Sequence, residues 1–126
     1  MKLDHVAIWA VDLERLRAFY ETYFGARASH QYENARKRFT SYFLTLPGGG
    51  RLELMHRPEI ATLPDAREYF GYAHLGVEVG SRAAVDALTR RLQADGFALL
   101  DGPRVTDGYY ESMVADPEGN RIVIAQ

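Results

Sequence analysis

The same order of elements occurs twice along the chain, and this repeat limits the possible folds more than any other feature. "DHVAI" aligns with "AHLGV" at an offset of 69 residues, which pairs His5 with His74. "LPGGGRLELM" aligns with "DPEGNRIVIA" at an offset of 70, which pairs Gly49 with Gly119. A repeat of this length predicts two copies of one supersecondary unit.

Hydrophobic periodicity predicts the elements of each copy. In each copy a strand is followed by a helix and then by three strands. The helices are expected over 11–25, between Asp12 and Gly25 as caps, and over 81–96, between Ser81 and Gly96. The strands are expected over 2–10, 26–33, 38–46, 50–55, 71–79, 97–102, 108–116 and 120–125.

These elements predict an α+β fold made of two tandem βαβββ modules. Module 1–55 and module 72–126, joined by a linker over 56–71, are expected to form one domain spanning 1–126. Placed side by side, the modules would form a curved eight-stranded mixed sheet around a cleft, with the helices on the outer face.

Composition and charge limit the kinds of partner and metal ligand that the chain can have. The net charge is −2 and the only basic cluster is short, at 36–38, so a small molecule or a protein is expected as partner rather than a nucleic acid. The chain has no cysteine, so any metal would need His and carboxylate ligands. The first sixteen residues carry charges and no long apolar run, so neither a signal peptide nor a membrane span is expected, and a cytoplasmic protein is predicted.

Three polar residues are predicted to share one sheet face. Alternation along the strands turns Leu52 and Leu54 toward the helices and His5, Glu53 and His74 to the other side. Two imidazoles and a carboxylate suit a divalent first-row metal and leave positions open for substrate. The alternative is that the histidines line an apolar-walled pocket and Glu53 is a solvated acid.

Four segments together resemble the vicinal oxygen chelate superfamily, which includes glyoxalases, bleomycin-resistance proteins and extradiol dioxygenases. They are "DHVAIWAVDLERLRAFYETYFGA", "RLELM", "YAHLGVEVGS" and "DGYYESMVADPEGNRIVI", and the chain is most similar to the glyoxalase-like branch. The resemblance implies a divalent metal in the cleft, Ni, Zn, Mn or Fe, with His5, Glu53 and His74 as three of four protein ligands. It also implies a homodimer and a lyase or isomerase of the lactoylglutathione lyase type.

The chain departs from the family pattern at Val123, where the glyoxalase-like branch carries a glutamate that binds metal and helps to move the substrate proton. Antiparallel pairing across the "DPEGN" turn sets Met113 opposite Val123 and places Glu111 on the same face. Glu111 is therefore the candidate catalytic base, and a rim carboxylate is its alternative role.

Trp9, Arg38, Tyr109 and Tyr110 are candidate substrate-binding residues. Aromatic residues in strands are more often core residues, and a solvated charge is the default for Arg38.

Three functions remain open at this point. The first is a metal-dependent glyoxalase-like enzyme acting on a small molecule that chelates the metal through neighbouring oxygens. The second is a non-catalytic, bleomycin-resistance-like protein that sequesters a ligand, which Val123 favours. The third is a ring-cleaving dioxygenase, since two histidines and one carboxylate also hold ferrous iron.

Overall fold

A computed structural model describes residues 3–61 and 71–126 of the chain. It divides into two compact units, Met1–Pro64 and Asp65–Gln126. Each contains one expected βαβββ module, so the α+β class and the two modules are confirmed.

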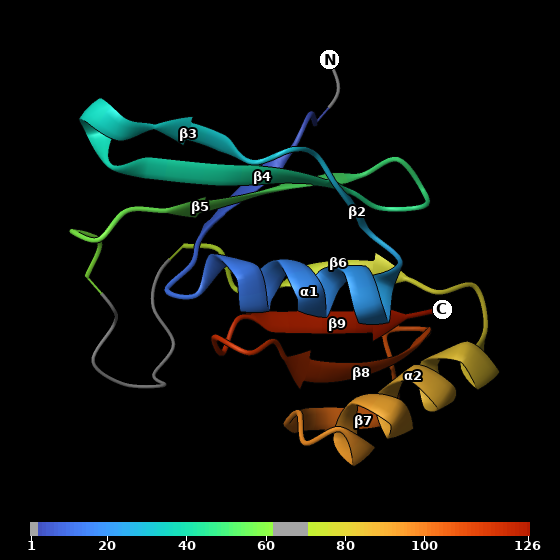
Figure 1. The fold of residues 1–126 in the computed structure, drawn as a ribbon. Coiled ribbons are helices and arrows are strands. Elements are labelled where there is room, and N and C mark those ends of the chain that lie inside the picture. The colour runs from blue at the N-terminus through green and yellow to red at the C-terminus, as the bar shows by residue number, and fades with distance from the viewer. Residues whose placement is uncertain (1–2, 62–70) are drawn as a thin grey trace. The chain divides into compact units, whose positions relative to one another are not determined.

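The first unit contains a five-stranded mixed sheet and one α-helix (Figure 1). Its strands run in the order β1-β5-β4-β2, and β3 pairs with β4. Strand β1 is parallel to β5, and the other pairs are antiparallel. The elements are β1 (Val6–Trp9), α1 (Leu13–Phe24), β2 (Arg27–Ala28), β3 (Tyr32–Asn34), the 3-10 helix η1 (Ala35–Lys37), β4 (Phe39–Thr45) and β5 (Arg51–His56).

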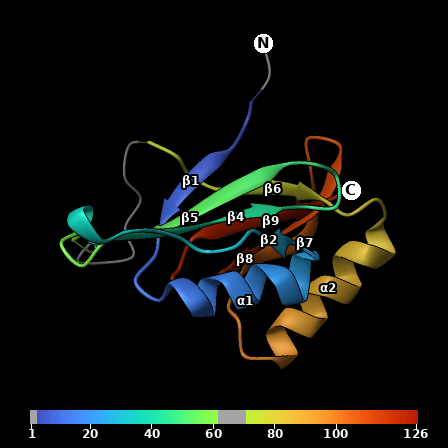
Figure 2. The ribbon, with the colours of Figure 1, turned by 45° about the horizontal axis from the view of Figure 1, so that its top comes forward.

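Helix α1 begins and ends at the expected caps. The Asp12 side chain accepts a hydrogen bond from the Arg15 amide, and Gly25 takes the left-handed conformation that ends many helices. One side of α1 packs against β4 and β5 (Figure 2). The buried residues of this core include Leu16, Phe19, Tyr20, Leu44, Leu52 and Leu54.

The second unit repeats this arrangement with a four-stranded sheet in the order β6-β9-β8-β7. Strand β6 is parallel to β9, and β9-β8 and β8-β7 are antiparallel. Helix α2 packs mainly against β8 and β7, and Val85, Leu92, Val114, Ile122 and Ile124 are fully buried. The elements are β6 (Leu75–Glu78), α2 (Arg82–Ala94), β7 (Leu99–Thr106), β8 (Tyr109–Ala115) and β9 (Arg121–Ala125).

Several strands differ from their predicted limits. Strands β1 and β6 begin at Val6 and Leu75, four residues later than predicted, so His5 and His74 precede these strands. The single strand expected over 26–33 is two short strands, since the pairing with β4 shifts by one residue between Ala28–Leu44 and Tyr32–Ser41. Ser29 Oγ accepts the Phe43 amide proton in the interval between them. Strand β7 continues past Gly102 to Thr106, and register shifts between Leu99 and Arg104 absorb the irregularity.

The expected linker is only partly described. Strand β5 extends to His56, one residue into the predicted linker, and residues 62–70 lie outside the described residues. Within the described ranges, no helix is both long and apolar enough to cross a membrane.

Candidate functional site

His5 and Glu53 meet on the side of the first sheet that faces away from α1. Leu52 and Leu54 are buried against the helix at 5% and 0% exposure, so the intervening Glu53 projects to the other side. Glu53 lies beside Ala7 in the parallel register, and His5 directly precedes β1. The His5 Nε2 and Glu53 Oε2 atoms are 3.6 Å apart, with both side chains partly shielded from solvent.

The other nitrogen of His5 is held by Asp4. The His5 Nδ1 atom lies 2.7 Å from Asp4 Oδ2, and Nδ1 is the donor because an ionised carboxylate only accepts. Arg51 also donates a hydrogen bond to Asp4. The hydrogen bond from His5 has the larger effect, and together the two lower the pKa of the Asp4 carboxyl. The carboxylate is thus the acceptor for both a ring nitrogen and a guanidinium.

Phe43 completes this cluster from β4. Its ring packs edge-on against the His5 imidazole with the centroids 5.1 Å apart, and the Arg51 guanidinium lies 4.9 Å from the ring centroid of Phe43. In the antiparallel register Phe43 is opposite Glu53. We call Asp4, His5, Phe43, Arg51 and Glu53 the His5 cluster.

The second unit has the same backbone frame with different side chains. His74 directly precedes β6, as His5 precedes β1, and Val123 lies beside Gly76 as Glu53 lies beside Ala7. Val123 is 9% exposed and His74 is exposed. Neither unit contains all three predicted ligands, and across residues 3–61 and 71–126 no three His, Asp or Glu side chains form a group able to hold a metal ion.

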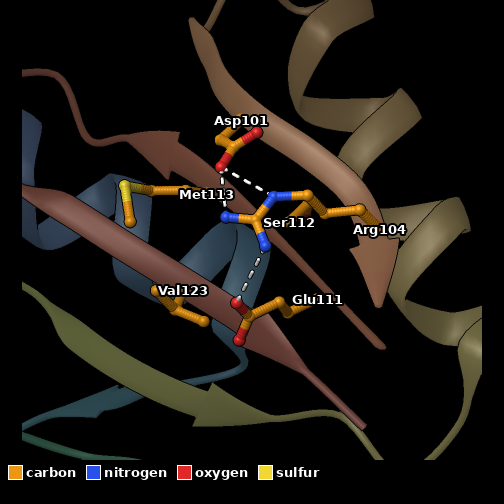
Figure 3. Close-up of a pocket in the computed structure, with 6 residues that line it drawn as sticks. All are labelled: Asp101, Arg104, Glu111, Ser112, Met113 and Val123. Atoms are coloured by element: carbon orange, nitrogen blue, oxygen red, sulfur yellow. Dashed lines mark hydrogen bonds and ion pairs between the residues drawn. The ribbon is translucent and has the colours of Figure 1, made fainter. Parts of the chain in front are cut away.

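A small hollow lies in the second unit, over β7, β8 and β9 (Figure 3). Met113 is opposite Val123, which confirms the predicted register, and Glu111 is opposite Arg104. Arg104 lies between two carboxylates, since its Nη1 atom is 4.0 Å from Glu111 Oε1 and its Nε atom donates to Asp101 at 2.9 Å. The hollow is lined by Asp101, Arg104, Glu111, Ser112, Met113 and Val123.

Trp9 and Tyr109 are both exposed side chains on strands. By alternation Trp9 shares the side of Ala7 and Glu53, and it is 42% exposed with its ring edge-on to Phe39. Tyr109 is 60% exposed at the start of β8, two residues before Glu111 and therefore on the same side.

Tyr110 and Arg38 have other partners. The Tyr110 hydroxyl donates to Asp86 on α2 at 2.7 Å, so the ring lies on the helix side of β8 and is turned away from the side that carries Glu111. Arg38 follows η1 and pairs with Glu59 at 3.3 Å.

Sequence reasoning missed Asp4, Arg51, Asp101 and Arg104. The signal for Arg51 was available, because it stands two residues before Glu53 and period two places both on one face of β5. Arg104 was hidden, since the predicted strand stopped at Gly102.

Fold and cluster together define a two-module α+β protein that gathers polar residues on the sheet face opposite its helix. Residues 2–124 match the sequence model of the Glyoxalase/Bleomycin resistance protein/Dioxygenase superfamily, and the chain belongs to this superfamily.

Known proteins similar to this chain include both sequence and structural relatives. Uncharacterized protein PA2024 of Pseudomonas aeruginosa is 33% identical over 135 residues, covering 95% of this chain and 84% of that protein. A glyoxylase/bleomycin resistance protein/dioxygenase domain from Frankia sp. has a TM-score of 0.85 at 19% identity, covering 99% of this chain and 96% of that chain. Leishmania major glyoxalase I has a TM-score of 0.78 at 20% identity, covering 98% and 85%. These two structural likenesses show the fold alone.

Proposed function

We propose that the protein is a metal-dependent enzyme of glyoxalase type, a lyase or isomerase whose small substrate chelates the metal through neighbouring oxygens. The observation that carries the proposal is the approach of His5 Nε2 to Glu53 Oε2, 3.6 Å apart on one face of the first sheet. The proposal is also supported by membership of a superfamily that includes glyoxalases.

The His5 cluster suits a divalent first-row metal. Imidazole nitrogen and carboxylate oxygen are ligands that Ni, Zn, Mn and Fe accept, and a ligating histidine commonly donates its other ring N–H to a carboxylate. Asp4 is that carboxylate for His5. We propose His5 and Glu53 as ligands, with His74 as the third because it holds the equivalent place in the second module.

When bound, such a metal supplies a Lewis acid that polarises a substrate carbonyl and acidifies the neighbouring C–H. Glu111 is proposed as the base that accepts this proton at a carboxylate oxygen. Its support is its position beside Val123 and Met113, since Val123 itself carries no group that could bind a proton. Trp9, Tyr109 and Arg38 are proposed to contact the substrate, and a homodimer is the proposed assembly.

The second candidate is ligand sequestration without catalysis, which two observations favour. Val123 carries no metal-ligating group, and the Glu53 side chain keeps partial contact with solvent beside His5, which lessens the cost of shielding its carboxylate without a metal. This function would use the same face of the sheets with metal-independent binding.

Metal content separates the two functions. Untagged protein is reloaded with Zn²⁺ or Ni²⁺, dialysed and measured by elemental mass spectrometry beside His5→Ala, Glu53→Ala and the control His30→Ala, which removes an exposed histidine. We expect near-stoichiometric metal in the wild type and in His30→Ala, and loss in the other two variants. Metal retained in Glu53→Ala would refute the ligand assignment, and no metal in any protein would favour sequestration.

A further inference from the structure

We infer that Asp4 is a positioning residue for His5, and that Arg51 holds Asp4 in place for this role. The inference rests on the proposed function, because it assigns the atom through which His5 binds a metal. It concerns the orientation and tautomer of the ring rather than a further ligand.

The two ring nitrogens of His5 face different carboxylates. Nδ1 lies 2.7 Å from Asp4 Oδ2 and donates its proton there. In a neutral imidazole only one nitrogen carries a proton, so the Nδ1–H tautomer leaves the Nε2 lone pair unprotonated. Nε2 is the nitrogen that faces Glu53, at 3.6 Å. Asp4 therefore selects the tautomer that presents a ligating atom to the proposed metal position.

Two side chains on one face of strand β5 contact His5 and Asp4. Glu53 approaches His5, and Arg51, two residues earlier on the strand, donates to Asp4. The Arg51 guanidinium also lies over the Phe43 ring, whose edge contacts His5. The exposed Asp4 carboxylate is thus held by two donors, and the imidazole ring is held from a third side by an aromatic neighbour.

The second module carries other side chains at the positions equivalent to Asp4 and Phe43. The repeat offsets that pair His5 with His74 pair Asp4 with Ala73, whose methyl group accepts no hydrogen bond. In the register that places Phe43 opposite Glu53, Met113 stands opposite Val123. The position that holds the Asp4 carboxylate in the first module therefore holds no carboxylate in the second, so this contact does not follow from the shared backbone frame.

Two measurements on Asp4→Ala test the inference, with Glu33→Ala, an exposed carboxylate on β3, as the control for lost charge. Long-range ¹H–¹⁵N NMR of the metal-free protein reports the His5 tautomer, and titration calorimetry with Zn²⁺ reports affinity. We expect an Nδ1–H tautomer in the wild type and in Glu33→Ala, and a shift toward Nε2–H in Asp4→Ala. Zn²⁺ affinity should fall about 10- to 100-fold in Asp4→Ala, as for other residues that orient metal ligands, with a smaller fall in Arg51→Ala.

An unchanged tautomer in Asp4→Ala, or an unchanged Zn²⁺ affinity, overturns the inference while leaving the proposed function intact. If the wild-type protein binds no Zn²⁺, the proposed function fails, and the tautomer of the metal-free protein alone decides whether Asp4 orients His5.

Discussion

Leu54 and Glu53 are neighbours on β5 that face opposite sides of the sheet, so replacing each by alanine separates the core from the proposed metal site. Leu54 is fully buried, with Ile8 and Tyr42 beside it in the register. Glu53 contacts His5 on the other side. We expect Leu54→Ala to destabilise the protein strongly and Glu53→Ala to leave it nearly as stable as the wild type.

The magnitude follows from burial. Leu54→Ala deletes about three buried carbon groups at roughly 0.8 kcal/mol each, a transfer loss of about 2.4 kcal/mol. The unfilled space adds a cavity cost, because strand neighbours and helix relax only partly, so the total should be about 3 to 4 kcal/mol. Glu53→Ala removes a partly exposed side chain whose nearest approach to His5 Nε2 is 3.6 Å, and the expected loss is at most about 1 kcal/mol.

Urea unfolding followed by circular dichroism measures both variants. Protein concentration must be the same throughout, since association would raise the apparent stability. Equal losses in the two variants, or a loss below about 1 kcal/mol in Leu54→Ala, would refute the assignment of faces on β5. The metal assignment of Glu53 would then lose its geometric basis.

Two further predictions concern a glycine within β7 and a carboxylate on α1. Gly102 has φ +81°, and a Cβ there would lie 2.6 Å from the Glu111 carbonyl oxygen. Gly102→Ala should therefore lower the free energy of unfolding by more than about 1 kcal/mol. In thermal unfolding it should be more destabilising than the control Gly108→Ala, where φ is +86° but no atom lies close to the added Cβ. The Tyr42 hydroxyl, followed by Arg17, lowers the pKa of Glu14 below its ordinary 4.5. This stabilisation is present above pH 4.5 and is lost as pH falls through the lowered pKa, so Glu14→Gln should flatten the acid side of a urea-midpoint profile from pH 7 to 3.

The sequence was sufficient to predict which strand residues face the helices and which positions are equivalent in the two modules. Period two assigned Leu52 and Leu54 to the helix side, and both are buried. The repeat offset placed His5 and His74 at equivalent positions, and each directly precedes the first strand of its module. The antiparallel hairpin set Met113 opposite Val123, as observed. These features depend on side-chain alternation and turn length, which a single sequence records.

Other features depend on contacts between distant segments, which periodicity does not record. The break between β2 and β3 coincides with a one-residue shift in their pairing with β4, where the Ser29 hydroxyl accepts the amide proton of Phe43. The continuation of β7 beyond Gly102 depends on irregular pairing with β8. "DGP" is a turn signal in the sequence, and only the partner strand shows that pairing resumes at Arg104.

The two modules show why the fold leaves the chemistry undetermined. Leu52 and Leu54 in one module, and Ile122 and Ile124 in the other, pack the helix side and maintain the same strand order. The opposite face bears no such packing requirement toward the helix, so Glu53 in one module and Val123 in the other fit one backbone frame. The fold therefore depends on the first set of residues, whereas the proposed metal binding depends on the second set. Because Asp4 and Arg51 serve that second face, variants at these positions should alter metal affinity more than stability.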